Sequence, residues 1–439
     1  MRQGSPGGQV ARPRHTLTRR PALACVAAVV SALGLASCSD PAASQSVRQT
    51  VQQSAYAGTP TGSTPAGSTP AGSTPTGTTS TGTTTTRVSA VASPTPTASE
   101  RARPRTLTIA ATGDVLVHGG VRSQAAADGR GRYDFRPMLA GLGPQIRSAD
   151  LAVCHLEVPL APPGGPFSGY PAFSAPPSLA DGLRQLGYDA CSTASNHSLD
   201  KGFAGVRRTL DNLDRVGLRH AGMARSEREA RTPTIVSVKG VRVALLSYTY
   251  GFNGIPLPQG RPYAANKLDA KRVITEAKAA RSRGAEVVVA SLHWGTEYNH
   301  RPNSQQLRIA AQLAESRTVD LVLGHHAHVV QPVDSVRGMW VAYGLGNSIA
   351  GASHNYAGGA TREGLLARFT LSERPDGRFG VSRVGLVPTY TASPPLRVVD
   401  VNRALAQGAA GAERLRTARD RTTKIARQRL DAAERRVVR

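Results

Sequence analysis

Cysteine, aromatic residues and long hydrophobic runs are all scarce in this chain of 439 residues. It has four cysteines, and aromatic side chains make up 5% of its residues. We see no interleaving of aromatic and basic residues of the kind that single-strand nucleic-acid binders use for stacking. The apolar run from Ala22 to Gly34 is too short to span a bilayer comfortably, which argues against a permanent transmembrane helix.

The N-terminal segment accounts for two of the four cysteines. Residues 1–37 combine five arginines with the short apolar run, as secretory signal peptides do. The segment Leu35-Ala36-Ser37-Cys38 resembles a bacterial lipobox, in which the cysteine is lipidated and becomes the new N-terminus. We predict a lipoprotein signal peptide over residues 1–37 and lipidation at Cys38. An ordinary cleaved signal peptide is the alternative. Either form is extracytoplasmic, and the lipidated form is anchored to the outer face of the cell membrane.

Two cysteines, Cys154 and Cys191, remain in the body of the chain. Both fall on predicted strands, so their pairing depends on the geometry of those strands. We expect two buried free thiols.

Basic residues far outnumber acidic ones. The formal net charge is +25, and without the signal segment 49 basic residues stand against 29 acidic ones. Such a surface attracts polyanions, among them anionic lipid headgroups and acidic cell-wall polymers. Export of the chain leads us to expect no nucleic-acid partner. A GC-rich genome, which favours Arg, Ala and Gly codons, is an alternative explanation of the charge.

Composition divides the exported chain into three parts. Residues 38–105 are rich in Thr, Ser, Pro and Gly, and have too few large apolar residues to offset the entropy of folding, so we predict a disordered linker. Residues 106–399 are predicted to form one globular domain. Residues 400–439 carry eleven basic and five acidic residues without a clear apolar stripe. We predict that this tail is a solvated helix or disordered.

Short apolar runs alternate with helical patterns through the globular part, which indicates an α/β fold. The predicted strands are 107–111, 151–155, 190–194, 287–291, 321–323 and 340–343. The predicted helices are 179–186, 203–216, 270–283 and 304–316. Two hairpins are predicted, over 234–248 with its turn at 239–240, and over 365–386 around 375–377.

Polar residues follow the ends of these strands. Three histidines lie within four residues at His325–His328, directly after an apolar strand. Because the carboxyl ends of parallel strands line up along one edge of an α/β sheet, we expect such residues to share one site. The predicted metal ligands are Asp114, Glu157, Asn196, His293, His325 and His328. The predicted catalytic residues are Asn196, His197 and His293. Further candidates are His118, His155, Glu297 and His326.

The donor types indicate the chemistry. Carboxylate, amide and imidazole ligands without cysteine suit Mn, Fe or Zn and argue against a closed structural zinc site. A carboxylate that bridges two ions about 4 Å apart would serve in-line attack on a phosphoryl centre. An Asn-His pair would add a ligand and a donor to the developing oxyanion. The set is chemically sufficient for a phosphoesterase.

The motifs G-D-V-L-x-H, H-L-E, S-N-H-S-L-D-K-G, H-W-G-T-E-Y, G-H-H-A-H-V-x-Q-P and Y-G-L-G-N occur in this order between residues 113 and 347. Together they resemble the CapA family, the poly-γ-glutamate capsule synthesis proteins, which are related to calcineurin-like metallophosphoesterases. The resemblance extends from about residue 107 to 386. This chain departs from the family pattern at His155, where Asn is common, at Ser195, where Asn is also common, and at Ala327, where Pro is usual.

The resemblance implies a four-layer αββα sandwich of metallophosphatase type, outside the membrane, that acts in the synthesis or export of an anionic polyglutamate. Polyglutamate synthase membrane subunits would be its partners. The residues that match the family's site positions are Asp114, Glu157, Asn196, His197, His293, His325 and His328, together with His118 and Glu297.

Three functions are therefore carried forward. The first is a CapA-like extracytoplasmic lipoprotein in poly-γ-glutamate or related surface-polymer biosynthesis. The second is a secreted metal-dependent phosphoesterase. The third is a non-catalytic subunit that binds an acidic polymer through its basic surface.

Overall fold

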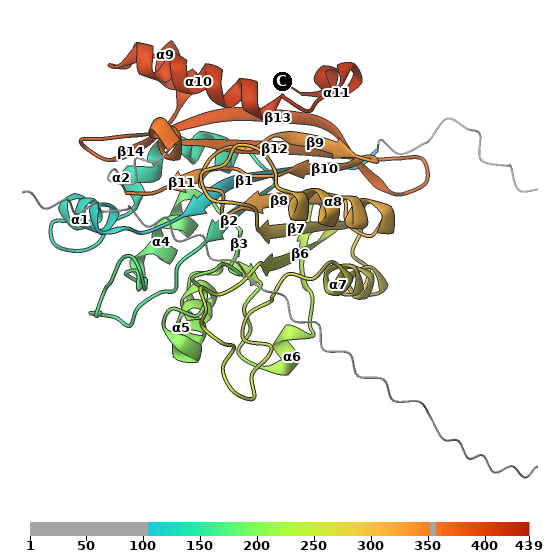
Figure 1. Cartoon of the computed structure of the whole chain (residues 1–439), viewed down its shortest axis with the longest axis horizontal. Helices are drawn as coiled ribbons and strands as arrows, with labels where there is room; N and C mark the ends of the chain where they lie inside the picture. The colour runs from blue at the N-terminus through green and yellow to red at the C-terminus, as the bar shows by residue number, and fades with distance from the viewer. Residues whose placement is uncertain (1–103, 352–356, 439) are drawn as a thin grey trace, which may run out of the picture. The chain divides into compact units, whose positions relative to one another are not determined.

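The computed structural model describes residues 104–351 and 357–438 (Figure 1). The predicted signal peptide, the lipidation site at Cys38 and nearly all of the linker lie outside these ranges. Within the part of the chain that is described, no helix has both the length and the hydropathy needed to cross a membrane.

The first sheet has eight strands, five of which pair in parallel. They are β1 (Thr106–Val115), β2 (Leu151–Leu156), β3 (Ala190–Ser192), β4 (Arg219–Ala221), β11 (Asn347–Ile349), β12 (Glu363–Glu373), β13 (Phe379–Ala392) and β14 (Arg397–Asp400). The order is β14-β13-β12-β1-β2-β3-β4, and the short β11 pairs in parallel with β1. Strands β1 to β4 are parallel neighbours, while β12, β13 and β14 are antiparallel.

The second sheet has six strands around a parallel centre. They are β5 (Thr234–Val238), β6 (Val241–Thr249), β7 (Val287–His293), β8 (Leu321–His325), β9 (Val333–Val336) and β10 (Met339–Ala342), in the order β5-β6-β7-β8-β10-β9. Antiparallel β5 and β9 form its two edges.

Helices cover the outer face of each sheet. Those on the first sheet are α1 (Gly119–Asp128), α2 (Arg136–Leu139), α3 (Gly143–Arg147), α4 (Ser178–Leu186) and α5 (Gly202–Arg215). Those on the second are α7 (Ala270–Ser282) and α8 (Ser304–Ser316). The remaining helical elements are η1 (Ala140–Leu142), α6 (Glu227–Ala230), η2 (Ala357–Arg362), α9 (Val401–Ala406), α10 (Ala412–Ala426) and α11 (Ala432–Val437).

The two sheets pack face to face, and the alternation of side chains along each strand supplies both sides of the packing. In β6, Val243 and Leu245 face the first sheet while Ala244 and Leu246 face α7 and α8. Strands that are buried on both faces in this way are apolar at nearly every position. Helices, sheet, sheet and helices follow one another, so the predicted four-layer αββα sandwich is confirmed.

Most predicted elements are present with small shifts in their ends. Both hairpins occur, as β5–β6 and β12–β13, and each predicted strand and helix overlaps an observed one. Helices α1, α2 and α3, between β1 and β2, were not predicted. They are short, and two of them begin with proline at an early position rather than with a strong amphipathic pattern.

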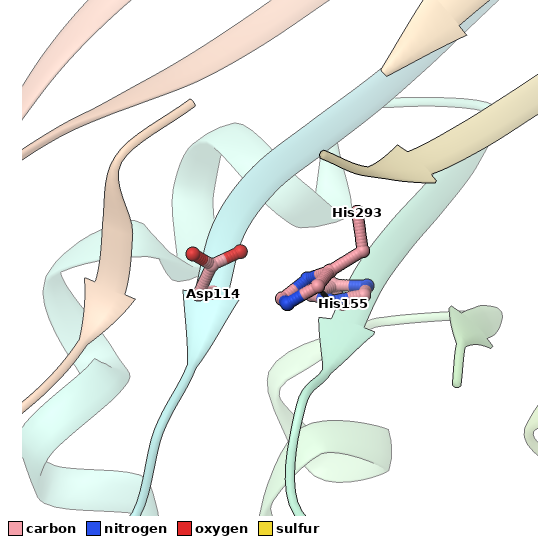
Figure 2. A group of neighbouring side chains, drawn as sticks. All are labelled: Asp114, His155 and His293. Carbon is pink, nitrogen blue, oxygen red and sulfur yellow. Dashed lines mark hydrogen bonds between the residues drawn. The ribbon is translucent and has the colours of Figure 1, made fainter. Parts of the chain in front are cut away.

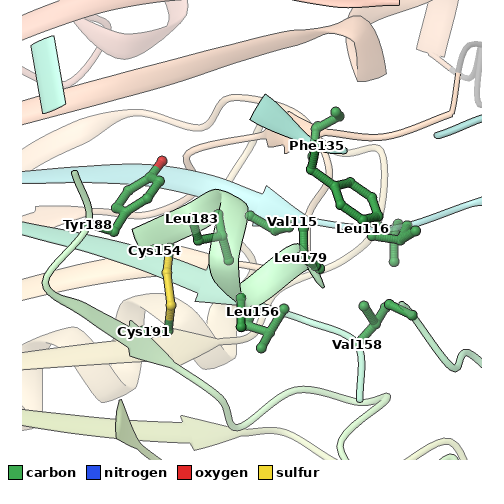
Figure 3. Packing of buried hydrophobic residues seen from close by; sticks show 14 of the residues in the cluster. Val115, Leu116, Phe135, Cys154, Leu156, Val158, Leu179, Leu183, Tyr188 and Cys191 are labelled. Atoms are coloured by element: carbon green, nitrogen blue, oxygen red, sulfur yellow. A yellow bond between two sulfur atoms is a disulfide. The ribbon is translucent and has the colours of Figure 1, made fainter. Parts of the chain in front are cut away.

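The expectation of two free thiols is wrong. Cys154 and Cys191 form a disulfide between the neighbouring strands β2 and β3 (Figure 3). The parallel register sets these two residues directly opposite each other, with their Cα atoms 4.5 Å apart. That separation is within the range in which a disulfide can form, whereas the spacing in the sequence could not reveal it.

The C-terminal tail is helical, which is one of the two states predicted for it, but α10 is not fully solvated because one of its faces is buried. Residues Leu415, Ala418, Thr422 and Ala426 form the buried stripe of α10. Leu415 and Ala418 pack against Tyr390 of β13. Arg421 adds an ion pair with the buried Glu363 at the start of β12. The stripe is hard to recognise in the sequence because three of its four members are small.

We expect Gly324→Ala to lower the free energy of unfolding by about 1–3 kcal/mol, the usual cost of overpacking. A Cβ atom on Gly324 would lie 1.9 Å from the carbonyl oxygen of Tyr343, which is backbone and cannot rotate away. Denaturant unfolding measures the change. The matched control is Gly120→Ala on α1, where a Cβ meets no atom within 4 Å and alanine should be neutral or stabilising. Equal stability of the two variants would contradict the close approach.

Candidate metal centre

The carboxyl ends of strands from both sheets meet at one edge of the sandwich. Asp114 lies near the end of β1 and His155 near the end of β2, and the register pairs them. His293 and His325 end β7 and β8 and are likewise paired. Figure 2 shows Asp114 and His155 on adjacent strands with the ring of His293 beside that of His155. The parallel strands thus bring residues about two hundred positions apart into one cluster.

Asp114 lies at the centre of the cluster and is fully buried. Its Oδ2 accepts a hydrogen bond of 3.1 Å from the backbone N–H of His326 and lies 3.1 Å from His328 Nδ1. Its Oδ1 lies 3.3 Å from His325 Nδ1. Burial by itself would raise the pKa of Asp114, but the neighbouring rings of His325 and His328 outweigh burial and hold that pKa well below its usual range. Asp114 is therefore a permanent negative charge inside the protein.

Glu157 follows β2 and lies on the other side of His328. Its Oε1 is 3.7 Å from His328 Nε2 and 4.0 Å from His293 Nε2. Burial raises the pKa of Glu157 well above its usual range. Burial lowers the pKa of His328, but the carboxylates of Glu157 and Asp114 outweigh it and raise this pKa to about 10. The site consequently retains protons that a bound cation would displace.

A chain of hydrogen bonds runs through two imidazole rings of the cluster. Asn196 Oδ1 lies 2.9 Å from His293 Nε2, and an amide oxygen only accepts, so this nitrogen carries a proton. His293 Nδ1 then accepts from His155 Nε2 at 2.9 Å, and His155 Nδ1 accepts from the Ser192 hydroxyl at 2.8 Å. Burial, together with neighbouring imidazoles, holds the pKa of both rings well below the usual value, so both are neutral. To ligate a metal, His293 would exchange one of these hydrogen bonds for the ion.

Several buried polar atoms of the cluster have no hydrogen-bond partner among the described residues. They are Asp114 Oδ1, both carboxylate oxygens of Glu157, both ring nitrogens of His325, and His326 Nδ1. The approach of His325 to Asp114 at 3.3 Å lacks hydrogen-bond geometry. Each unsatisfied group costs about 1–3 kcal/mol, and so many in one place need an explanation. A divalent cation would satisfy all of these donor types at once.

The distances among ligand atoms agree with this explanation. Within the described residues, three sets have ligand atoms that all lie within 4.8 Å of one another. They are Asp114, His155 and His293; Asp114, Glu157 and His328; and Glu297, His326 and His328. All members are buried except Glu297. The donors are compatible with a divalent metal ion and include no thiolate.

The structure brings most of the predicted site residues together. Eight of them form the cluster: Asp114, His155, Glu157, Asn196, His293, His325, His326 and His328. Glu297 lies at its edge, with Oε1 4.0 Å from His326 Nδ1.

His197 and His118 lie outside the three ligand sets. Both rings pack edge-on against Phe173, with centroids 4.6 Å and 5.4 Å away. His197 Nδ1 is paired at 2.8 Å with Asp200 Oδ2. Burial lowers the pKa of His118 to about 4. These two histidines flank the cluster rather than belonging to its ligand sets.

Two residues at the site were missing from the predicted set. Asn347 Oδ1 lies 2.9 Å from His328 Nδ1, and its amide donates to the Thr361 carbonyl at 2.9 Å, which fixes its orientation. The ring of Tyr250 lies 4.5 Å from that of His326. Tyr250 directly follows β6, and Asn347 begins β11 beside β1. The strand-end argument that selected the other residues would have found Tyr250.

The turn after β8 has an unusual backbone. His326 and His328 have φ angles of +86° and +56°, which non-glycine residues rarely adopt. Such conformations cost about 1–3 kcal/mol each and occur where surrounding structure imposes them. Here the hydrogen bond from the His326 N–H to Asp114 and the contact between His328 and Asn347 hold the turn. The turn points successive imidazoles toward one cluster.

By its fold and site, this protein is an α/β sandwich of two sheets with a cluster of carboxylates and imidazoles at the ends of its parallel strands. The chain belongs to the bacterial capsule synthesis protein family PGA_cap, whose model matches residues 108–352.

Among curated relatives, the PGA biosynthesis protein CapA of Bacillus subtilis is 30% identical over 219 residues, which cover 46% of this chain and 52% of the relative. The capsule biosynthesis protein CapA of Bacillus anthracis is 25% identical over 241 residues, covering 53% and 56%. The chain thus spans about half the length of the curated relatives it matches. A solved phosphatase from Mycoplasma pneumoniae is 12% identical to this chain, and the match covers 66% of this chain and 96% of that one. Its TM-score of 0.42 is too low to support an inference.

We expect Mn²⁺ or Zn²⁺ to raise the melting temperature of the full-length protein purified in detergent. A ligand that binds only the folded state stabilises it by about 2.7 kcal/mol at a concentration one hundred times its Kd. Asp114→Asn should remove most of this shift, because the central carboxylate is lost. Differential scanning fluorimetry with and without EDTA measures the effect.

The matched control is Asp420→Asn, which changes an exposed aspartate that pairs with Arg419 in α10 and lies outside the cluster. Its shift should equal that of the unmodified protein. Absence of bound metal by elemental analysis, together with no thermal shift, would contradict the metal centre.

Proposed function

We propose that this protein acts in the biosynthesis of poly-γ-glutamate or a related anionic cell-surface polymer, through a divalent-metal centre at the shared edge of its two sheets. The observation that carries the proposal is the set of buried ligand atoms on Asp114, Glu157 and His325 that find no hydrogen-bond partner in the part of the chain that the structure describes. The process, capsule biosynthesis, is inferred from the family to which the chain belongs and from its curated relatives.

The residues that would hold the metal are those nearest the unpartnered atoms, namely Asp114, Glu157, Asn196, His293, His325 and His328. When bound, Mn, Fe or Zn would polarise a substrate oxygen and make a water molecule at the site more acidic. Asp114 and Glu157 provide the negative charge that a divalent cation needs inside the protein. Two such ions could share the site, since the ligand sets overlap at Asp114 and at His328.

Asn196, His197 and His293 are proposed to act on the substrate. Asp200 Oδ2 holds His197 Nδ1 at 2.8 Å and also accepts the Phe173 backbone N–H at 2.7 Å, so the imidazole is fixed in orientation. Because the Nδ1–H of His197 donates to Asp200, its other ring nitrogen would donate to an oxygen that gains charge only when the ring carries both protons. Asn196 presents its Oδ1 to His293, which couples the two side chains.

A metal-dependent phosphoesterase is the second candidate. The observation that favours it is the donor set itself, because carboxylates and imidazoles that can hold ions close together suit in-line attack on a phosphate ester. A non-catalytic subunit that binds an acidic polymer through basic surface charge is the third outcome that the assay below distinguishes.

We expect His197→Ala and His293→Ala each to lower turnover by about 10²–10³-fold, the usual effect of removing one oxyanion donor or electrostatic group. Each substitution should also lower stability somewhat, because the His197 ring packs against Phe173 and His293 is fully buried. Circular dichroism and the melting temperature check the fold. The matched control is His220→Ala: His220 lies in β4, is paired with Asp214 and is absent from the cluster, so its turnover should match the unmodified protein.

The assay offers a phosphomonoester, a phosphodiester and poly-γ-glutamate, each with Mn²⁺ or Zn²⁺. Cleavage or transfer of polyglutamate supports the capsule role, and hydrolysis of phosphate esters alone supports the phosphoesterase. Binding of polyglutamate without turnover, weakening as salt increases, supports the binding subunit. Turnover that persists in both histidine variants would contradict the proposed roles.

We also propose that the protein is a lipoprotein on the outer face of the cell membrane, where it would work with polyglutamate synthase membrane subunits. The support is the Leu35–Cys38 sequence behind a basic and apolar segment. Cys38→Ala should move the protein from the detergent phase to the aqueous phase in Triton X-114 partitioning, because the acyl chains are lost. The control is Cys25→Ala, which leaves the lipobox intact. A Cys38→Ala protein that stays fully in the detergent phase would contradict the anchor.

A further inference from the structure

A cavity of about 260 Å³ lies at the end of the second sheet opposite the metal centre. Two of the residues that line it are Asp320, which directly precedes β8, and Met339, which begins the parallel strand β10. The metal centre includes His325, at the other end of β8. The five residues of β8 separate the two places by roughly 15 Å. The cavity is therefore a site of its own.

We call this cavity the arginine pocket, because four arginines line it: Arg317, Arg337, Arg374 and Arg378. They come from three separate segments, namely the end of α8, the turn between β9 and β10, and the turn between β12 and β13. Asp320 is the one acidic residue among the described residues that line the pocket, and it is already paired with Arg281. Folding thus collects positive charge that no short segment of the sequence contains.

Most of this positive charge has no counter-charge in the described part of the protein. Arg317, Arg374 and Arg378 form no ion pair with any described residue. Arg337 Nη1 lies 4.0 Å from Glu315 Oε1, but both side chains are mostly exposed, so water and salt weaken this pair. Like charges gathered around one small cavity repel one another, and a bound anion would relieve that repulsion.

The surrounding backbone holds two of the guanidinium groups in place. Arg378 Nη2 donates to the carbonyl oxygen of Arg317 at 3.0 Å. A guanidinium has five N–H donors, so this bond leaves Arg378 with donors for a ligand. The guanidinium of Arg374 occupies the space in which a Cβ atom would lie at Gly380, so the glycine makes room for it beside β13.

The number of arginines favours a phosphate group over a carboxylate as the ligand. A carboxylate has two oxygens, and the fork of one guanidinium group can satisfy both of them. A phosphate group has more oxygens around one atom, so it accepts hydrogen bonds from several guanidinium groups at once. The cavity is slightly smaller than the sites that hold drug-sized molecules, which suits an ion or a headgroup.

The described part of the chain begins close to this pocket. Glu373, which directly precedes Arg374, donates its backbone N–H to the carbonyl oxygen of Arg105 at 2.9 Å. The residues before Arg105 lead in the sequence to Cys38, the proposed lipid anchor. A lipid headgroup of the membrane is therefore one source of phosphate for the pocket, and free phosphate is the other.

We propose that the arginine pocket binds a phosphate group, carried by an anionic lipid headgroup or present as free phosphate. The negative charge of the ligand supplies the missing counter-charge, and its oxygens accept from the arginine N–H groups. This inference goes beyond the proposed function and does not depend on the metal centre.

The test uses the full-length protein in detergent. EDTA first removes metal and is then dialysed away, so that phosphate cannot bind to an ion at the metal centre. Isothermal titration calorimetry measures the affinity for inorganic phosphate, pyrophosphate and dihexanoyl phosphatidylglycerol. We expect binding that weakens as salt increases. Dihexanoyl phosphatidylcholine is the zwitterionic lipid control, and poly-γ-glutamate tests a carboxylate polymer.

The double variant Arg317→Asn/Arg337→Asn should weaken binding of the phosphate ligands by about tenfold or more, because it removes two sets of charged hydrogen-bond donors. Its melting temperature should not fall, since these arginines have φ angles of +55° and +51°, which asparagine tolerates better. The matched control is Arg130→Asn. Arg130 is exposed, has a φ angle of +51° and precedes a glycine, as Arg337 does, but it lies outside the pocket, so its affinities should equal those of the unmodified protein.

The order of affinities identifies the source of the phosphate. Tighter binding of phosphatidylglycerol than of inorganic phosphate indicates a headgroup, and the reverse order indicates free phosphate. Three results would overturn the pocket: no phosphate ligand binds, the double variant binds them as the unmodified protein does, or only poly-γ-glutamate depends on the two arginines. None of these results bears on the metal centre, and loss of metal binding would not bear on the pocket.

Discussion

The charge of Asp114 is the constraint on which this edge of the molecule depends. A carboxylate without solvent contact is tolerated only where neighbouring groups compensate it, and breaking a buried pair typically costs about 3–5 kcal/mol. The backbone N–H of His326 and the rings of His325 and His328 do so, and all of them lie at the end of β8 of the second sheet or directly after it. The two sheets are thus held together at this edge by electrostatic contact, and by apolar packing elsewhere.

The same arrangement leaves several buried carboxylate oxygens and imidazole nitrogens without a hydrogen bond among the described residues. Both ring nitrogens of His325 and one of His326 have no hydrogen-bond partner in the part of the chain that the structure describes, and neither do the two carboxylate oxygens of Glu157. Unsatisfied polar atoms on four neighbouring buried residues, Asp114, Glu157, His325 and His326, are typical of a binding site that stores unfavourable energy for its ligand.

Much of the site could be predicted from the sequence because it follows one local rule, that polar residues come directly after apolar strands. That rule selected Asp114, His155, His293 and the His325–His328 segment without any knowledge of the three-dimensional fold. The four-layer arrangement came from resemblance to a family, since alternating strands and helices alone are compatible with several α/β architectures.

The contacts that could not be predicted depend on how strands and helices distant in the sequence align, and no short segment of the sequence contains that information. The contact between His155 and His293 crosses from one sheet to the other, and the Cys154–Cys191 bond depends on how β2 aligns with β3. The packing of α10 depends on alanines and a threonine, which an apolar pattern hardly distinguishes from an exposed face.

The Cys154–Cys191 bond has a consequence for where in the cell the site can be completed. Each cysteine immediately precedes a residue of the hydrogen-bond chain, His155 on β2 and Ser192 on β3. A covalent link at that point fixes the spacing of the two strands beneath the imidazoles. Disulfides form and persist in oxidising surroundings and are rare in the reducing cytosol. A copy of the chain in a reducing compartment would therefore lack the covalent link that fixes the two strands beneath its histidines, and an oxidising compartment would be needed to complete the site.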